Sequence, residues 1–151
     1  MAPTLRFLFG ARVDIGEATV VGEGPHGVRR IIPILGGTFA GPRLSGRVLP
    51  GGADWQVIRP DGVAEIEARY TLETSDGALV YVRNPGIRTA APEVMARLAA
   101  GEPCSPDEYY FRTVPRFETG SAQYEWLHRI VSVCAGERLA RQVKLSFFEV
   151  T

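Results

Sequence analysis

The sequence predicts an all-β protein: a single-domain antiparallel β-barrel of about eight to ten short strands over residues 1–151, with one short helix around residues 92–100. Three observations support this fold class. A chain of 151 residues is one domain by length and buries enough surface to need no disulfide or metal. Apolar and polar residues alternate along most segments, as in strands. The 17 Gly and 11 Pro residues are spread through apolar stretches and mark frequent turns.

The predicted strands of the N-terminal half are short apolar or alternating runs bounded by Gly and Pro. They are Leu5–Val13, Glu17–Gly22, Val28–Leu35, Thr38–Phe39, Leu44–Leu49 and Asp54–Arg59. Pro33 interrupts the third run, and because proline cannot donate a ladder hydrogen bond, we expect an edge position or a bulge there.

The clearest segment is Val63–Thr74, in which alanine, isoleucine, tyrosine and leucine alternate with glutamate, arginine and threonine. Such a pattern predicts a strand with one apolar and one polar face. Asp76-Gly77 then separates it from a second strand, Ala78–Asn84. Asp-Gly between two alternating runs is a strong signal for a β-hairpin.

The C-terminal part is predicted to contain the helix and three further strands. Pro92 stands at the first turn of the helix and Gly101 ends it. The strands are Tyr109–Glu118, Tyr124–Val133 and Ala140–Val150, with a turn at Cys134–Glu137 between the last two. With so little helix to cover a sheet face, closure into a lipocalin-like barrel is the favoured way to hide the strand edges.

Charge and apolar patterning exclude several classes of protein. Seventeen basic and seventeen acidic residues give no net charge, which argues against a nucleic-acid or membrane partner. The N-terminal segment Met1–Phe9 is interrupted by Arg6 and does not resemble a secretory signal, so we expect a cytoplasmic protein. Cys104 and Cys134 lack zinc-site spacing and are interpreted as free, partly buried thiols.

Two further motifs carry little chemistry. Gly22–Gly27 matches the G-x-G-x-x-G pattern, but a dinucleotide site needs a helix directly after it. The segment Val28–Pro33 contains three β-branched residues and ends in proline, so we expect no helix there. His26 and His128 are too few for a three-histidine zinc site, and no nucleophile elbow accompanies them. The sequence therefore predicts neither a metal nor a cofactor.

Gly51-Gly52-Ala53-Asp54-Trp55 is a first candidate site. The glycines allow a sharp turn, after which Asp54 and Trp55 begin a strand at a barrel rim. There Asp54 is a candidate acid or base and Trp55 a stacking wall for a ligand. The alternative, equally supported, is an Asp that caps its own turn beside a packed Trp.

A second candidate group combines aromatic and charged residues on the later strands. It consists of Arg69, Tyr70, Tyr110, Arg112, Glu118, Tyr124 and Trp126. On an inner barrel face, Glu118 would transfer a proton while the others orient an aromatic or carbonyl ligand. An outward ladder of cross-strand pairs explains the same composition slightly better.

One long run resembles a known family. Gly36–Trp55 is similar to the hallmark segment of domain-of-unknown-function family 3237, also called uncharacterised protein family 0311. Further segments continue the resemblance: Arg69-Tyr70, Thr74 with Asp76-Gly77, Tyr110–Thr113, Phe117-Glu118, and Tyr124 with Trp126-Leu127. The resemblance implies a small antiparallel β-barrel that is often a homodimer, and it draws attention to Asp54, Trp55, Arg69, Tyr70, Arg112 and Glu118 without assigning them roles.

Three functions follow as hypotheses. The first is a cofactor-independent enzyme of isomerase, cyclase or lyase type, with Asp54 or Glu118 as acid or base, acting on a small aromatic or polyketide-like carbonyl compound in the barrel. The second is a non-catalytic carrier of a small apolar or aromatic ligand. The third is a solid structural module. The interleaving of charged residues with strand aromatics favours the enzyme.

Overall fold

The computed structural model describes residues 1–151 and contains eleven strands, one α-helix and two 3₁₀ helices. The strands are β1 (Leu5–Ile15), β2 (Thr19–Gly24), β3 (Gly27–Ala40), β4 (Ser45–Val48), β5 (Ala53–Ile58), β6 (Ala64–Thr74), β7 (Leu79–Ala90), β8 (Tyr109–Thr113), β9 (Arg116–Thr119), β10 (Ser132–Arg138) and β11 (Gln142–Val150). The helices are α1 (Pro92–Ala99), η1 (Pro106–Glu108) and η2 (Ala122–Arg129). None of them is long and apolar enough to cross a membrane.

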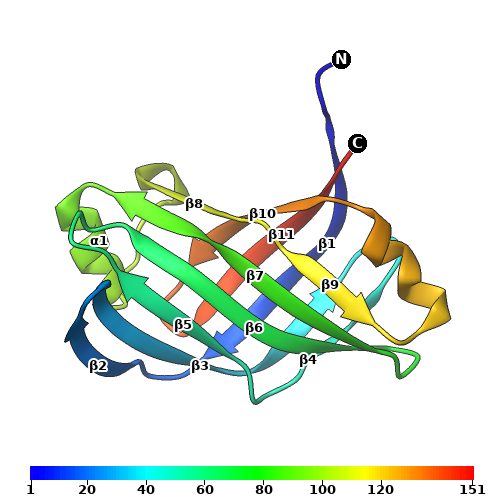
Figure 1. Cartoon of the computed structure of the whole chain (residues 1–151), viewed down its shortest axis with the longest axis horizontal. Helices are drawn as coiled ribbons and strands as arrows, with labels where there is room; N and C mark the ends of the chain where they lie inside the picture. The colour runs from blue at the N-terminus through cyan, green and yellow to red at the C-terminus, as the bar shows by residue number, and fades with distance from the viewer.

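The strands form one antiparallel sheet whose pairings run in a ring. The order is β1, β3, β5, β6, β7, β8, β10 and β11, and β11 pairs again with β1. Short β4 lies between β3 and β6, while β2 and β9 extend the sheet beside β3 and β7. The predicted all-β antiparallel fold class is therefore confirmed, and the architecture is barrel-like (Figure 1).

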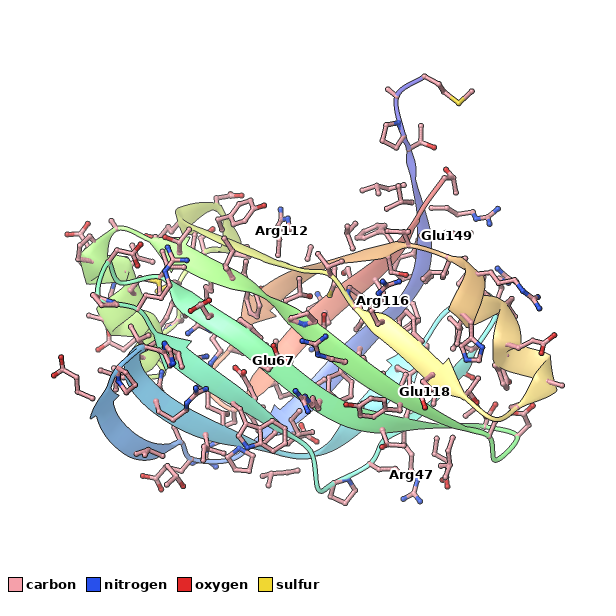
Figure 2. The ribbon with its side chains drawn as sticks, viewed as in Figure 1. Arg47, Glu67, Arg112, Arg116, Glu118 and Glu149 are labelled. Atoms are coloured by element: carbon pink, nitrogen blue, oxygen red, sulfur yellow. The ribbon has the colours of Figure 1, made fainter.

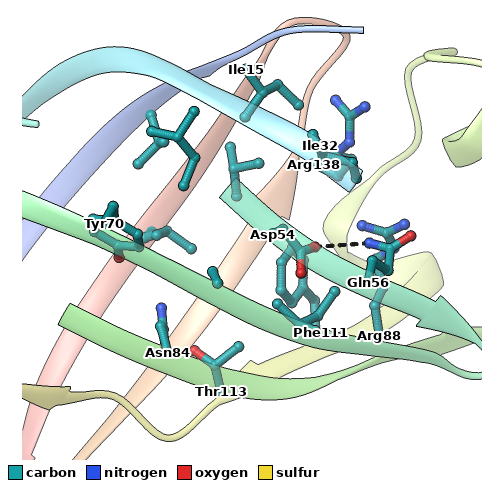
Figure 3. Close-up of a pocket in the computed structure, with 16 residues that line it drawn as sticks. Ile15, Ile32, Asp54, Gln56, Tyr70, Asn84, Arg88, Phe111, Thr113 and Arg138 are labelled. Carbon is teal, nitrogen blue, oxygen red and sulfur yellow. Dashed lines mark hydrogen bonds between the residues drawn. The ribbon is translucent and has the colours of Figure 1, made fainter. Parts of the chain in front are cut away.

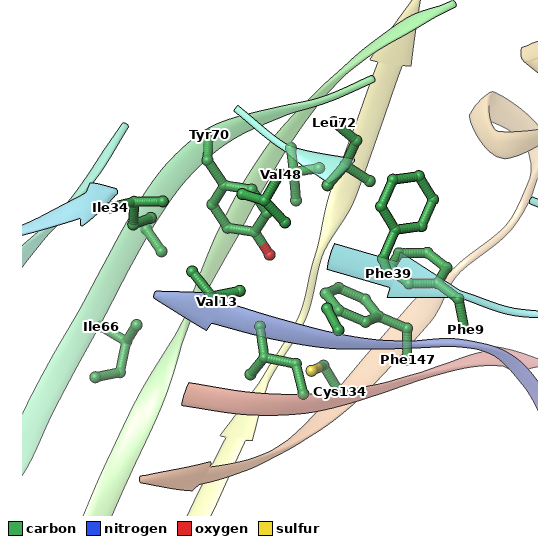
Figure 4. Packing of buried hydrophobic residues seen from close by; sticks show 14 of the residues in the cluster. Phe9, Val13, Ile34, Phe39, Val48, Ile66, Tyr70, Leu72, Cys134 and Phe147 are labelled. Carbon is green, nitrogen blue, oxygen red and sulfur yellow. The ribbon is translucent and has the colours of Figure 1, made fainter. Parts of the chain in front are cut away.

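The two ends of the barrel-like sheet are filled differently. Beside β9, the rings of Phe9 and Phe147 stack with centroids 4.2 Å apart, and Phe39 and Phe117 pack against Phe9. These rings and the aliphatic side chains around them belong to one apolar core (Figure 4). Toward the opposite end, α1 covers the sheet with the buried side chains of Val94 and Leu98.

Gly36 and Gly37 lie inside a strand and do not form a turn between two strands. Val28–Leu35 and Thr38–Phe39 were predicted as separate strands, but Gly36 and Gly37 continue one strand, β3, which passes from β5 to β4. Gly37 allows this change of partner, because a Cβ there would collide with the backbone carbonyl of Arg12 on β1.

The largest error of the sequence prediction lies at Tyr124–Val133. The segment was predicted as a strand, but Ala122–Arg129 is a 3₁₀ helix and β10 begins only at Ser132. Tyr124 and Leu127 are the buried residues of η2, and this three-residue spacing is the period of a 3₁₀ helix. The predicted turn at Cys134–Glu137 is also wrong, since β10 continues through it.

Proline divides the predicted strand Tyr109–Glu118. β8 ends at Thr113 and β9 begins at Arg116, with Val114 and Pro115 between them. Both halves pair with β7, but only β8 also pairs with β10. Pro115 lacks the N–H that a continuous ladder would need.

Gly52 should tolerate no side chain. A Cβ at this position would collide with the carbonyl oxygen of Arg69 and lie 2.8 Å from Cβ of Tyr70. We expect Gly52→Ala to lower the free energy of unfolding by about 2 kcal/mol or more, as overpacking does. Urea denaturation of Gly52→Ala beside Gly120→Ala, where nothing lies within 4 Å, measures this. Equal stability of the two variants would contradict the close approach.

Candidate functional site

A cavity of about 50 Å³ lies inside the sheet (Figure 3), and a groove that adjoins it reaches the end of α1. Its apolar wall consists of Val13, Ile15, Ile32, Ile34, Ile66, Ala68, Phe111, Val143 and Leu145. Its polar side chains are those of Asp54, Gln56, Tyr70, Asn84, Arg88, Thr113 and Arg138. The interior is therefore largely filled, and its remaining space is bordered by ionisable groups.

Asp54 is held at the cavity wall by an interruption of the sheet. β5 and β6 pair at Asp54 and again at Val57, but not at the two residues between. In this gap the backbone N–H of Glu67 donates to Oδ1 of Asp54 at 2.8 Å. Nε2 of Gln56 donates to Oδ2 at 3.0 Å. The carboxyl group thus takes a backbone donor from the neighbouring strand.

The surroundings of Asp54 favour a proton on its carboxyl group more than water does. Burial raises the pKa of Asp54, and it outweighs the hydrogen bonds from Glu67 and Gln56 and the positive charges of Arg88 and Arg30. A carboxyl group in such surroundings is suited to exchange protons with a bound molecule.

Arg88 faces the same cavity from β7. It is 3% exposed, its Nε has no hydrogen-bond partner, and its guanidinium lies 5.5 Å from the centre of the Phe111 ring. Burial, and next the charge of Arg138, lower the pKa of Arg88 to about 10, and Asp54 opposes this shift. Arg88 is therefore still a cation at neutral pH.

Two more arginines lie at the same end of the cavity. Nη1 of Arg30 donates to Oε1 of Gln56 at 3.0 Å, so Gln56 links Arg30 to Asp54. Nη1 of Arg138 donates to the carbonyl oxygens of Leu139 and Ala140. Figure 3 shows Arg88 and Arg138 on the side where Asp54 and Gln56 lie.

Several neutral polar groups of the cavity have no partner. The hydroxyl groups of Tyr70 and Thr113 and Oδ1 of Asn84 are buried and make no hydrogen bond of good geometry, although the side chain of Asn84 lies close to the Tyr70 hydroxyl. Burial strongly raises the pKa of Tyr70, so its phenol stays protonated. These atoms offer donors and acceptors to hydroxyl or carbonyl groups of a bound molecule.

The structure brings only two of the predicted site residues together. Asp54 and Tyr70 both line the cavity. The side chains of Trp55, Arg69, Tyr110, Arg112 and Glu118 are exposed, and Figure 2 shows Arg112 and Glu118 on the outside of the sheet. Successive residues of a strand point to opposite faces, so Trp55 and Arg69 are turned away by the inward position of Asp54 and Tyr70. Phe111 and Phe117 point inward, so Tyr110, Arg112 and Glu118 beside them point outward. Glu118 is therefore not part of the interior site.

The predicted ligand-binding residues of η2 have structural contacts instead. The hydroxyl of Tyr124 donates to Oδ1 of Asp76 at 2.9 Å, in the turn between β6 and β7. The guanidinium of Arg43 lies 3.5 Å from the centre of the Trp126 ring. Both residues pack against the apolar core, and neither lines the cavity.

The sequence prediction missed most of the polar site. Asn84 and Arg88 share the inward face of β7 with Val80 and Val82, and Gln56 shares that of β5 with Asp54. Polar residues at core positions of an alternating strand were the available signal. No group of three or more His, Cys, Asp or Glu side chains is placed to hold a metal ion, and Cys104 and Cys134 are free thiols.

Comparison with known proteins agrees with the fold. Residues 3–150 match the family described as "Protein of unknown function (DUF3237)". The chain belongs to this family. A UPF0311 protein of Rhodopseudomonas palustris is 49% identical to this DUF3237 chain over 152 residues, 99% of each protein. A crystal structure of a conserved protein from the same organism has a TM-score of 0.95, with 46% identity over 100% of this chain and 99% of the other. The predicted family is confirmed.

Two other comparisons extend the range of DUF3237 relatives. A "beta-barrel like protein" from Acinetobacter baumannii has a TM-score of 0.87 and 40% identity, covering 100% of this chain and 98% of that one. A protein named "Hydroalkoxylation enzyme" from Penicillium herquei is 28% identical over 130 residues, 86% of this chain and 72% of the other.

Asp54 should make stability depend on pH. A raised pKa means that the folded chain binds this proton more tightly than the unfolded chain, whose Asp54 has the ordinary value of 3.8. Relative to Asp54→Asn, the wild-type free energy of unfolding should therefore fall as the pH rises from 3.8 through the folded-state pKa. Urea unfolding of both proteins at several pH values measures the difference. A difference that stays constant or increases with pH would contradict the raised pKa.

Proposed function

We propose that this protein is an acid–base enzyme that acts on a small unsaturated or carbonyl compound bound inside the barrel-like sheet. Asp54 would transfer the proton, and Arg88 would stabilise negative charge on an oxygen of the substrate. One observation carries the proposal: a largely buried carboxyl group with a raised pKa and a guanidinium without a carboxylate partner line the same cavity, most of whose wall is apolar.

Asp54 has the contacts of a positioned acid or base. Two donors from different residues fix its carboxyl oxygens, so the group cannot turn freely. Its raised pKa means that this carboxyl group holds a proton more readily than an aspartate in water does, as a proton donor to a substrate must. The phenol of Tyr70, which stays protonated at neutral pH, offers a further hydrogen bond to the substrate.

Arg88 supplies the fixed positive charge that such chemistry needs. An enolate forms when a proton beside a carbonyl group is removed, or when an oxygen adds to the double bond of an unsaturated ketone before the neighbouring carbon takes up a proton. A buried cation stabilises this enolate strongly because little water screens the charge. The guanidinium is already oriented against Phe111, so little reorganisation is required during the reaction.

The Penicillium herquei relative supports a reaction class. Hydroalkoxylation adds a hydroxyl group across a carbon–carbon double bond: the O–H bond breaks, a C–O bond forms, and a proton reaches the other carbon. Within one molecule this is an isomerisation: the oxygen adds to one carbon, the proton moves to the other, and no oxidant, reductant or second substrate is needed. The relative is 28% identical, so it supports cyclase chemistry for this chain as a proposal.

A carrier function is the second candidate, because most of the cavity wall is apolar. The size of the cavity restricts the ligand in both the enzyme and the carrier proposal. Ligand pockets usually measure about 300 Å³ or more, whereas this cavity measures about 50 Å³. A ligand of ordinary size therefore requires the lining side chains to move. Cytoplasmic location and homodimer formation stay predictions from the sequence.

The enzyme proposal can be tested with a compound that cyclises by adding its own hydroxyl group to a double bond, without an oxidant or a second substrate. An ortho-hydroxyphenyl propenyl ketone is suitable, because its hydroxyl group adds to its own double bond and gives a methylchromanone. We expect the wild type to accelerate this reaction and Asp54→Asn to lose about 100-fold or more of the acceleration. Glu65→Gln, which removes an exposed carboxylate of β6, serves as the matched control.

Two readouts separate the outcomes. Product formation is followed by chromatography, and deuterium uptake from D₂O at the carbon beside the carbonyl group reports proton delivery. Equal rates for Asp54→Asn and the wild type would refute the role of Asp54. Ligand binding that is unchanged by Asp54→Asn, with no turnover by either protein across a panel of such ketones, would favour the carrier.

A further inference from the structure

We propose that the ligand of this cavity is an organic oxyanion, a carboxylate or a phenolate, bound by Arg30, Arg88 and Arg138. The inference names the ligand class of the site proposed above and rests on that site, although binding itself does not require catalysis.

The charges at this end of the cavity do not balance. The cavity lining holds two guanidinium groups, those of Arg88 and Arg138, and one carboxyl group, that of Asp54. The adjoining groove adds the guanidinium groups of Arg30 and Arg141 and the carboxylate of Glu17. Each ion pair elsewhere in the chain joins an arginine to a carboxylate, and none includes Arg30, Arg88 or Arg138. An anion placed here would therefore meet an excess of positive charge.

The hydrogen bonds of the three arginines leave donors free. Arg30 bonds the neutral amide of Gln56, and Arg138 bonds only backbone carbonyl groups. Arg88, 3% exposed, has an Nε without a partner. A guanidinium prefers paired oxygens of a carboxylate or a similar oxyanion, and a buried cation without one is unfavourable.

The arginines also lower one another's affinity for protons. Burial is the first cause of the lowered pKa of both Arg88 and Arg138. Arg138 contributes next to the shift of Arg88, and Arg30 to that of Arg138. This repulsion destabilises the empty site, and a bound oxyanion would relieve it.

The position of the arginines matches an entrance. Ile15, Ile32 and Arg138 line both the cavity and an adjoining groove of about 680 Å³. Arg30, Arg141 and the end of α1 at residues 99–101 border this groove, and the carboxylate of Glu17 lies there too. A ligand that enters from the groove therefore passes the arginines before it reaches Asp54.

This placement also suggests how the ligand is oriented. With its oxyanion at the guanidinium groups, the carbon atoms next to it lie beside Asp54, and the rest of the molecule meets either the aliphatic cavity wall or the groove. Asp54 would then exchange a proton close to the charged group, where Arg88 stabilises an enolate best.

The test compares ligands that differ only in charge. Benzoate and neutral benzamide are titrated into the full chain by calorimetry at low salt, and para-nitrophenolate and para-nitroanisole form a second pair. We expect at least one anion to bind about tenfold or more tightly than its neutral partner. Preference in the first pair identifies a carboxylate ligand, and preference in the second pair a phenolate.

Variants assign the preference to the arginines. Arg88→Gln and Arg138→Gln should each lower the affinity for the preferred anion toward that of the neutral compound. Arg116→Gln, which removes an exposed arginine of β9 that forms no ion pair, should leave it unchanged. Circular dichroism shows whether Arg88→Gln folds. If it does not, the affinity of Arg138→Gln, a half-buried residue that lines both the cavity and the groove, tests whether the arginines bind the anion.

Two outcomes would overturn the inference: equal affinity for charged and neutral members of both pairs, or a preference that survives both arginine substitutions. If the protein binds the anions but turns over none of the ketones of the enzyme test, the proposed enzyme is refuted while the oxyanion remains the ligand of the cavity.

Discussion

The alternation of side chains around a ring of paired strands is the constraint on which this structure depends. Each strand of the ring sends every second residue inward, so eight strands contribute to one interior and α1 covers only one end of it. The identity of an inward residue therefore decides whether the interior is a core or a site. A polar residue at such a position meets polar residues of other strands, because all inward positions converge.

The interior is divided along its length accordingly. Phenylalanine rings fill the end beside β9, where Phe9 contacts Phe39, Phe117 and Phe147. Such packing stabilises the fold without polar groups. At the α1 end, charged and unpaired groups replace it, and each costs stability when it is buried. The apolar half therefore offsets the unfavourable half, an arrangement common where a protein maintains a functional site.

The sequence allowed the fold to be predicted well, because alternation and turn residues are local signals. The predicted strand Val63–Thr74 is β6 with one extra residue at its start, and the Asp76-Gly77 hairpin and the α1 helix lie where they were expected. The errors came from non-local causes. Gly36-Gly37 interrupts the pattern of β3 but not the strand, since Gly37 passes close to the backbone of β1 and a side chain there would collide with it. The spacing of Tyr124 and Leu127 indicates a 3₁₀ helix only once their burial is known.

The site was less predictable for a related reason. Asp54 and Tyr70 were recognised by residue type, but sequence neighbours such as Trp55 and Arg69 were grouped with them although they occupy opposite faces. Arg88 and Arg138 lie on strands far apart in the sequence, and only the order of strands around the ring brings them near Asp54. Alternation within one strand shows from the sequence that a polar residue faces inward. It does not show which residues of the other strands lie beside it.

The gap between β5 and β6 has a consequence for protein engineering. Asp54 obtains the amide of Glu67 only because two residue pairs of the ladder are left open beside it. In an uninterrupted barrel the same amide would already bind the neighbouring strand, and a transplanted aspartate would have no backbone donor to hold it. Transfer of this chemistry to another scaffold therefore requires the local opening of the sheet as well as the side chains.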